Sequence, residues 1–219
     1  MGKVLDTFLA SLASSRHDGY PYDHWILAGC LPVETCEAIR SLPFPPPAIE
    51  DTEGKRDSHN ESRQFISPNE RREFPVLEDL SAALQSPHCI AALERTCGAQ
   101  LEDTFLRIEY TQDTGGFWLG PHTDVGPKKF TMMIYLSDGP GSETWGTDVL
   151  DREHEIVKTV SSPYNAGMIF VPSDHSWHGF HRRQINGIRR SLIINYVTTE
   201  WRNTHELAYP DQTVTANGA

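Results

Sequence analysis

The sequence lacks the patterns of a membrane or secreted protein. Its 219 residues include no apolar run of about 20 residues, the length that a membrane-spanning helix needs, and no signal-peptide pattern. Basic residues are scarce, because 19 Lys and Arg stand against 30 Asp and Glu, which gives a net charge of -11. Neutralising phosphates is what drives binding to nucleic acids and acidic membranes, so this balance argues against both partners. We expect a soluble intracellular protein.

Cysteine is also sparse. The chain has four cysteines, none of them in a CxxC pair and all of them distant from the histidine-rich segments: Cys30, Cys36, Cys89 and Cys97. Scattered cysteines of this kind indicate neither a zinc site nor a disulfide framework. We therefore expect reduced, partly buried thiols in the cytoplasm.

The chain has no internal repeat, and its length fits one domain spanning residues 1–219. The first 100 residues are expected to be mainly helical and loop, with one short strand at 24–27. Apolar spacing and proline positions predict helices at 4–14, 32–42, 76–85 and 87–97. Gly98 is expected to cap the last of them.

A loop is expected at residues 43–60, because three consecutive prolines are followed by charged residues without periodicity. Two interpretations stay open: a solvated surface loop, or a lid over an active site. Arg56, in this loop, and Arg63, just after it, allow the same pair of interpretations. They either recognise an anionic substrate or lie on a solvated surface.

From residue 104 onward the pattern changes to strands and turns. Short β-branched or aromatic runs occur at 104–110, 129–136, 154–160, 166–172, 177–181 and 189–197, separated by Gly, Asn, Asp and Pro. Strands joined by such turns favour a sandwich or small barrel over parallel βαβ units. The expected fold class is α+β, with an all-β second half.

Two segments of this half carry metal-binding chemistry. In an extended strand His122 and Asp124 point to the same side, so both side chains can contact one ion. His175, His178 and His181 are the candidates for a third ligand. If residues 186–187 turn between the last two strands, His178 lies across a hairpin from Arg189, which favours His178.

Two imidazoles and one carboxylate are the ligand set that holds mononuclear non-haem Fe(II) and leaves coordination positions open for oxygen chemistry. A downstream arginine can anchor the far carboxylate of a dicarboxylic co-substrate. The three motifs occur in order: HxD at 122–124, Trp-His at 177–178 and Arg-x-Ser at 189–191. A reducing compartment would also suit Fe(II).

As a set, these motifs resemble the 2-oxoglutarate and Fe(II)-dependent oxygenase superfamily, particularly its prolyl-hydroxylase-like branch. The resemblance covers about residues 104–197 and implies a double-stranded β-helix, or jelly-roll, core with the N-terminal helices packed outside. It implies that His122, Asp124 and His178 bind iron and that Arg189 binds 2-oxoglutarate. Strand alternation places Ser191 on the face of Arg189 and Arg190 on the other.

The resemblance also suggests further contacts. Tyr135 would donate a hydrogen bond to the distal carboxylate of 2-oxoglutarate, unless it is an ordinary strand aromatic, and Tyr110 would also reach the co-substrate. Candidate substrate contacts are Phe117, Trp118, Trp145 and Asn195. Halogenases of this superfamily have a small residue in place of the metal carboxylate, so Asp124 favours hydroxylation.

The resemblance thus implies a dioxygenase that uses Fe(II), 2-oxoglutarate and O2 and releases succinate and CO2. A small metabolite or amino-acid-like molecule is the expected substrate, and a peptidyl prolyl-type residue is the alternative. A catalytically silent sensor that binds metal and 2-oxoglutarate is a rival of another class. A cupin-type enzyme is disfavoured, because its usual HxH motif with a following glutamate is absent.

Overall fold

The computed structural model describes residues 2–56, 63–124 and 126–216. Its helices are α1 (Lys3–Ala13), α2 (Val33–Arg40), α3 (Pro68–Glu73), α4 (Pro75–Gln85), α5 (Pro87–Cys97) and the short 3-10 helices η2 (Ser142–Thr144) and η3 (Thr204–Glu206). The first strands are β1 (Arg16–Asp18), β2 (His24–Ala28), β3 (Gln64–Phe65), β4 (Phe105–Asp113), β5 (Leu119–His122) and β6 (Lys128–Tyr135). The remaining strands are β7 (Asp148–Leu150), β8 (Ile156–Thr159), β9 (Ala166–Phe170), β10 (His178–Phe180) and β11 (Arg189–Val197).

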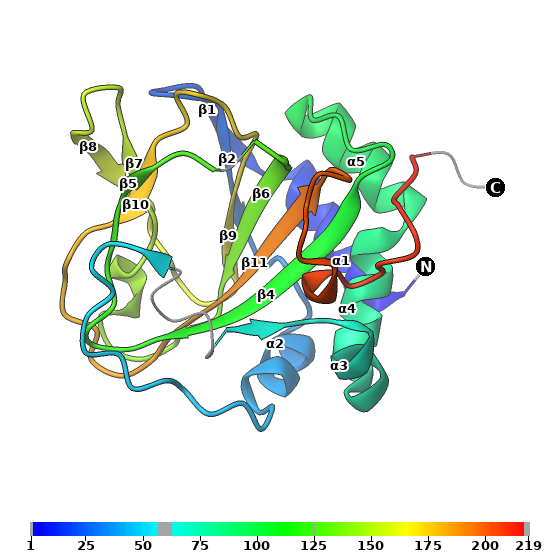
Figure 1. The fold of residues 1–219 in the computed structure, drawn as a ribbon, viewed down its shortest axis with the longest axis horizontal. Helices are drawn as coiled ribbons and strands as arrows, with labels where there is room; N and C mark the ends of the chain where they lie inside the picture. Colours follow the sequence, from blue (N-terminus) through cyan, green and yellow to red (C-terminus); the bar gives the residue numbers. More distant parts are fainter. Residues whose placement is uncertain (1, 57–62, 125, 217–219) are drawn as a thin grey trace.

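The strands form two antiparallel sheets. The large sheet has the order β1-β2-β9-β6-β11-β4-β3, and the small sheet has the order β5-β10-β7-β8. In Figure 1 the small sheet lies to the left of the large one, and α1, α4 and α5 lie to the right. The predicted jelly-roll core with helices outside is therefore confirmed.

Packing of the helices buries one face of the large sheet. The main core cluster joins Phe8 of α1, Leu80 of α4 and Ile90 of α5 to the outward face of the sheet, including Ile108 and Ile194. Burying such side chains is the main favourable contribution to folding. The helices thus hold the strands in place from behind and leave the opposite face for a site.

The helix ends follow local sequence signals. Gly98 ends α5 in the left-handed conformation, with φ 67°, as its place after the apolar run predicts. The helix α3 begins with a capping box formed by Ser67 and Glu70, which we did not predict although its Ser-Pro-Asn-Glu sequence has the required spacing. The described residues contain no helix both long and apolar enough to cross a bilayer.

A cavity of about 550 Å³ opens between the two sheets. Its described lining comes from β4, β6 and β11 of the large sheet, from β5 and β10 of the small sheet, and from residues 54–56 and 201–206. This volume falls within the usual range of small-molecule sites.

The predicted hairpin between the last two strands is wrong. His178 lies on β10, which pairs with β5 and β7, whereas Arg189 lies on β11, which pairs with β4 and β6. The chain crosses from one sheet to the other between them, as jelly-roll connections do. The predicted extended strand through the HxD motif also ends early, because β5 stops at His122 and Asp124 lies beyond it.

Candidate metal and co-substrate site

His122 and His178 come together as cross-strand partners of β5 and β10. Their ring centroids are 4.2 Å apart. Gly179 allows the two strands to approach, because a Cβ at this position would lie 2.8 Å from the carbonyl oxygen of Leu119. The structure thus places His178 beside His122 by strand pairing, and not through the hairpin we predicted.

Both histidines are oriented by the same backbone contact. Nδ1 of His122 lies 2.9 Å from the carbonyl oxygen of Gly120, and Nδ1 of His178 lies 2.9 Å from that of Ser176. A carbonyl oxygen can only accept, so each Nδ1 carries the proton and Nε2 has the free lone pair. Such a contact commonly fixes the tautomer of a metal-ligating histidine.

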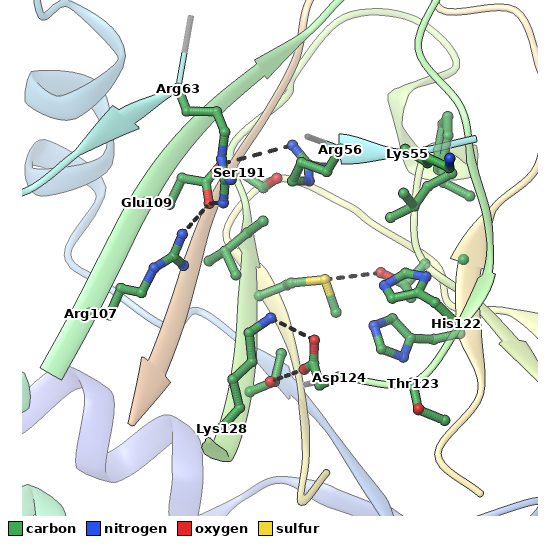
Figure 2. A pocket seen from close by; sticks show the side chains of 18 of the residues that line it. Lys55, Arg56, Arg63, Arg107, Glu109, His122, Thr123, Asp124, Lys128 and Ser191 are labelled. Carbon is green, nitrogen blue, oxygen red and sulfur yellow. Dashed lines mark hydrogen bonds and ion pairs between the residues drawn. The ribbon is translucent and has the colours of Figure 1, made fainter. Parts of the chain in front are cut away.

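Asp124 completes the cluster from beyond the end of β5. The ligand atoms of His122, Asp124 and His178 all lie within 4.8 Å of one another. Lys128 Nζ donates to Asp124 Oδ1 at 2.6 Å, and the hydroxyl of Thr131 donates to Oδ2. These two contacts, and not the strand alternation that we predicted from sequence, direct the carboxylate toward the imidazoles (Figure 2).

The protonation states of the cluster suit a divalent cation. Burial lowers the pKa of His122 to about 3, the nearby His178 adds to this effect, and burial also lowers the pKa of His178. Burial alone would raise the pKa of Asp124, but Lys128 and Thr131 help to hold it well below its ordinary value. Neutral imidazoles and an ionised carboxylate are the forms that bind a metal. These residues therefore fit a non-haem Fe(II) centre.

The Thr131→Val variant is expected to weaken metal binding by about 10- to 100-fold, the usual cost of losing a contact to a ligating side chain. Valine keeps the shape of the side chain but cannot donate to Asp124. Calorimetric titration with Mn(II) would measure the affinity, with Thr159→Val on β8 as the matched control. Equal affinities of both variants and the wild-type chain would contradict the role of Thr131.

The metal-free chain is expected to lose stability as the pH falls below about 6.5. The unfolded chain protonates His122 near its ordinary pKa of 6.5, whereas the folded chain stays unprotonated down to about pH 3. The unfolded state therefore binds more protons in this window, and the free energy of unfolding falls by up to about 1.4 kcal/mol per pH unit. Urea unfolding with a chelator at several pH values would measure the slope. His122→Asn should make it shallower, and an unchanged slope would contradict the prediction.

Arg189 begins β11 and is almost completely buried, with 5% of its surface exposed. Its Nε donates to the carbonyl oxygen of Trp145 at 2.6 Å, and its Nη1 donates to Asp113 Oδ2 at 2.5 Å. The guanidinium carbon lies 4.5 Å from the centroid of the Phe180 ring. These contacts fix the plane of the guanidinium and leave Nη2 and the second N–H of Nη1 without a hydrogen-bond partner among the described residues.

Ser191 and Tyr135 lie on the cavity side of the large sheet. Ser191 lines the cavity, and its hydroxyl lies 2.8 Å from that of Thr111. The hydroxyl of Tyr135 lies 3.0 Å from Thr147 Oγ1, and Thr147 in turn lines the cavity. Thr147 therefore lies between Tyr135 and the cavity, and Tyr135 is not part of the described lining.

Our expectation for Tyr110 is wrong. Tyr110 pairs across the sheet with Leu192 and packs in the helix-facing core, where its ring lies 6.3 Å from that of Phe44. Arg189 pairs with Asp113 of β4, so the two side chains lie on the same face of the sheet. Tyr110 lies an odd number of positions before Asp113 on β4, and strand alternation therefore places its side chain on the other face. Tyr110 therefore cannot reach a co-substrate held at Arg189.

The four proposed substrate contacts have different locations. Phe117 lines the cavity, whereas the other three do not belong to its described lining. Trp118 donates from its indole to Asp51 at 2.6 Å and stacks with Arg182, and Trp145 is buried with Phe117 and Phe180. Asn195 is fully buried behind the wall.

The described part of the 43–60 loop forms one rim of the cavity. Gly54 accepts a backbone hydrogen bond from Gly120 at 3.0 Å, and residues 54–56 line the cavity. Residues 57–60 lie outside the described residues, and a lid stays a prediction.

The polar wall that β4 contributes to the cavity was not predicted from the sequence. Arg107 and Glu109, both 1% exposed, line the cavity opposite the histidines (Figure 2). Arg107 donates to Asn195 Oδ1 at 3.0 Å, and Asn195 donates to Thr131 Oγ1 at 2.9 Å. A continuous hydrogen-bond chain thus joins Glu109 to Asp124. The alternation of apolar and polar residues from 106 to 111 was the signal that could have revealed this wall.

No family model matches the sequence, and no curated protein matches it. Solved structures do resemble the fold. A prolyl-4-hydroxylase from Pseudomonas putida has 15% identity and a TM-score of 0.57, over 89% of this chain and 93% of that one. A prolyl hydroxylase from Trichoplax adhaerens, in complex with a hypoxia inducible factor peptide fragment, has 12% identity and a TM-score of 0.54, over 89% of each chain.

A third similar structure is HygX from Streptomyces hygroscopicus with nickel and 2-oxoglutarate bound. It has 15% identity and a TM-score of 0.52, over 90% of this chain and 92% of that one. At such identities a structural likeness establishes a shared fold, while function depends on the residues of the site.

Proposed function

We propose that this protein is a 2-oxoglutarate-dependent Fe(II) dioxygenase that hydroxylates a small metabolite or amino-acid-like molecule. The observation that carries the proposal is the convergence of a His-Asp-His cluster and a buried arginine on one cavity of a jelly roll. Fe(II) would be held by His122, Asp124 and His178. The bound metal and 2-oxoglutarate would supply the oxidising chemistry, with succinate and CO2 as products.

The residues of the chain would bind and orient the reactants. Arg189 would donate to the distal carboxylate of 2-oxoglutarate from Nη2 and the second N–H of Nη1, since the Trp145 carbonyl and Asp113 already accept from Nε and from one N–H of Nη1. Ser191 lies on the same strand face and adds a hydroxyl. Phe117 and Phe180, whose rings are 5.6 Å apart, would exclude water around the guanidinium and strengthen this ion pair. Tyr135 would support the wall through Thr147.

The four cysteines suit the reducing cytoplasm that Fe(II) also favours. All four are free and buried. Burial raises the pKa of Cys30, Cys89 and Cys97 to about 12, which keeps these thiols protonated and unreactive at neutral pH.

A peptidyl hydroxylase is the second candidate function. It is supported by the likeness to the Trichoplax adhaerens enzyme, whose structure contains a peptide fragment. The cavity volume of about 550 Å³ favours a small molecule, because such sites measure about 300 to 1,000 Å³.

Anaerobic titration with Fe(II) and 2-oxoglutarate, followed by measurement of succinate after O2 is admitted, tests the proposal. The substrate panel should include free amino acids, other small metabolites and proline-containing peptides. We expect 2-oxoglutarate to bind only with metal present and a small molecule to stimulate succinate release. Absence of 2-oxoglutarate binding would rule out the proposal. Binding without succinate across the panel would favour a silent sensor, and stimulation by peptides alone would favour the second candidate.

A further inference from the structure

The cavity has a charge opposite to that of the whole chain. Six cationic side chains and three carboxylates are found in its described lining: Lys55, Arg56, Arg63, Arg107, Lys128 and Arg189 against Glu109, Asp124 and Glu206. The chain as a whole carries a net charge of -11. Asp113, which is not part of this lining, pairs with both Arg56 and Arg189 and reduces the excess from three charges to two. Bound Fe(II) and the 2-oxoglutarate dianion would cancel each other, so this excess would remain for a further ligand. A cavity of one sign attracts ligands of the other.

Arg63 and Arg107 lie with Glu109 on the cavity wall opposite His122 (Figure 2). Glu109 accepts two hydrogen bonds from Arg63, at 2.9 and 2.7 Å, and one from Arg107 at 3.1 Å. Burial alone would raise the pKa of Glu109, but the arginines around it lower it to about 2. Arg107 also pairs with Glu206 at 2.6 Å, and Arg56 Nη1 approaches Glu109 Oε1 to 3.9 Å, so Glu109 lies among three guanidiniums.

Arg56 is the accessible member of this group. Its side chain is 20% exposed, and its guanidinium carbon lies 4.7 Å from the centroid of the Phe117 ring. Arg56 Nη1 donates to Asp113 Oδ1 at 3.2 Å, while the other oxygen of Asp113 accepts from Arg189. Asp113 therefore holds two guanidiniums side by side, one at the proposed co-substrate position and one facing the rest of the cavity.

Two further donor groups of the cavity lining have no partner among the described residues. The ammonium of Lys55 lines the cavity and takes part in no ion pair there. The indole N–H of Trp201, also in the lining, is buried without a hydrogen-bond partner. Leaving a buried donor unsatisfied costs free energy, and a ligand acceptor would recover it.

We propose that Lys55 and Arg56 bind a carboxylate of the prime substrate, so that the protein acts on a carboxylate-bearing small molecule. This inference rests on the proposed function, because it assigns Arg189 to the co-substrate and the rim at Lys55 and Arg56 to the prime substrate. A carboxylate matches the planar fork of Arg56, and Lys55 adds a point charge. The far end of the molecule would then extend toward the histidines across the cavity.

The test uses the full chain loaded with Mn(II) and 2-oxoglutarate without oxygen. Calorimetry would measure the binding of a panel of amino and hydroxy acids, of their neutral amides, and of phosphate esters of the hydroxy acids. We expect binding by one or more free acids and at least about 10-fold weaker binding by the matching amide. Binding by amides or phosphate esters alone, or by no acid at all, would overturn the proposal.

Substitutions then locate the carboxylate. Lys55→Gln and Arg56→Gln should each weaken binding of that acid by about 10-fold or more. Arg152→Gln, at an exposed position outside the cavity, is the control and should leave it unchanged. The affinity for 2-oxoglutarate, measured in the same samples, reports whether the cavity is intact. Unchanged acid binding in both cavity variants would overturn the assignment.

The two proposals fail in distinguishable ways. A chain that binds metal and 2-oxoglutarate but shows no preference for acids would retain the proposed function and lose this inference. A chain that binds no 2-oxoglutarate would lose the proposed function itself.

Discussion

The His178→Ala variant is expected to lose at least about 100-fold in metal affinity, a larger effect than the 10- to 100-fold that follows loss of a contact to a ligand. His178 is the one member of the cluster contributed by β10, and its Nε2 lone pair is directed by the Ser176 carbonyl. Its removal would leave two ligands, both from the segment around β5. Calorimetric titration with Mn(II) or Fe(II) would measure the loss.

His175→Ala and His181→Ala are the matched controls, since both residues were rival candidates for the third ligand. The side chain of His175 is 39% exposed and contacts Asp174, and that of His181 is 42% exposed and contacts Asp148. Both variants should bind metal like the wild-type chain. Loss of binding in either control, with binding retained in a folded His178→Ala chain, would show that the cluster has been assigned incorrectly.

The Arg189→Ala variant is expected to weaken 2-oxoglutarate binding by about 100-fold or more while metal affinity changes little. Truncating one partner of a buried ion pair commonly costs about 2 to 5 kcal/mol, or about 30- to 4,000-fold in affinity. The measurement is 2-oxoglutarate binding to the Mn(II)-loaded chain without oxygen. Metal affinity is measured separately. It should change little, because the described hydrogen bonds of the guanidinium are to Asp113 and Trp145 and to none of the three proposed metal ligands.

Arg190→Ala is the matched control for this variant. Arg190 is the next residue along β11 and, by strand alternation, its side chain leaves the opposite face of the sheet. The Arg190→Ala substitution removes the same charge from the same strand as Arg189→Ala. Both variants therefore include the long-range electrostatic effect on an anionic ligand, and the difference between them reports the direct contact. Equal weakening by both substitutions would mean that Arg189 contributes only charge, with no direct contact to the co-substrate.

Local signals in the sequence were sufficient to predict much of the fold. Apolar spacing placed α1, α4 and α5 within one or two residues of their observed bounds, and Gly98 marked the end of α5. Alternation along β11 separated Arg189 from Arg190. These features depend on a few neighbouring residues, which is why one sequence can reveal them.

Pairing between distant strands could not be predicted in the same way. The place of His178 depends on which sheet β10 joins, and this is decided by packing across the whole domain rather than by the turn at residues 186–187. Tyr110 was expected at the co-substrate because of the family resemblance. Glu109 faces the cavity, and strand alternation places Tyr110, the next residue of β4, on the opposite face of the sheet. Net charge also carries no information on local charge, since a total of -11 occurs together with six cationic side chains in the described cavity lining.

The hydrogen-bond chain from Glu109 through Arg107, Asn195 and Thr131 to Asp124 bears on how this protein could diversify or be redesigned. These hydrogen bonds connect the β4 wall of the cavity to Asp124. Exchanging Arg107 or Glu109 to admit a new molecule would therefore disturb the proposed metal ligand as well. Lys55 and Arg56 come from a rim segment outside this chain. New specificities should therefore evolve most readily at the rim, while the interior of the cavity stays constant.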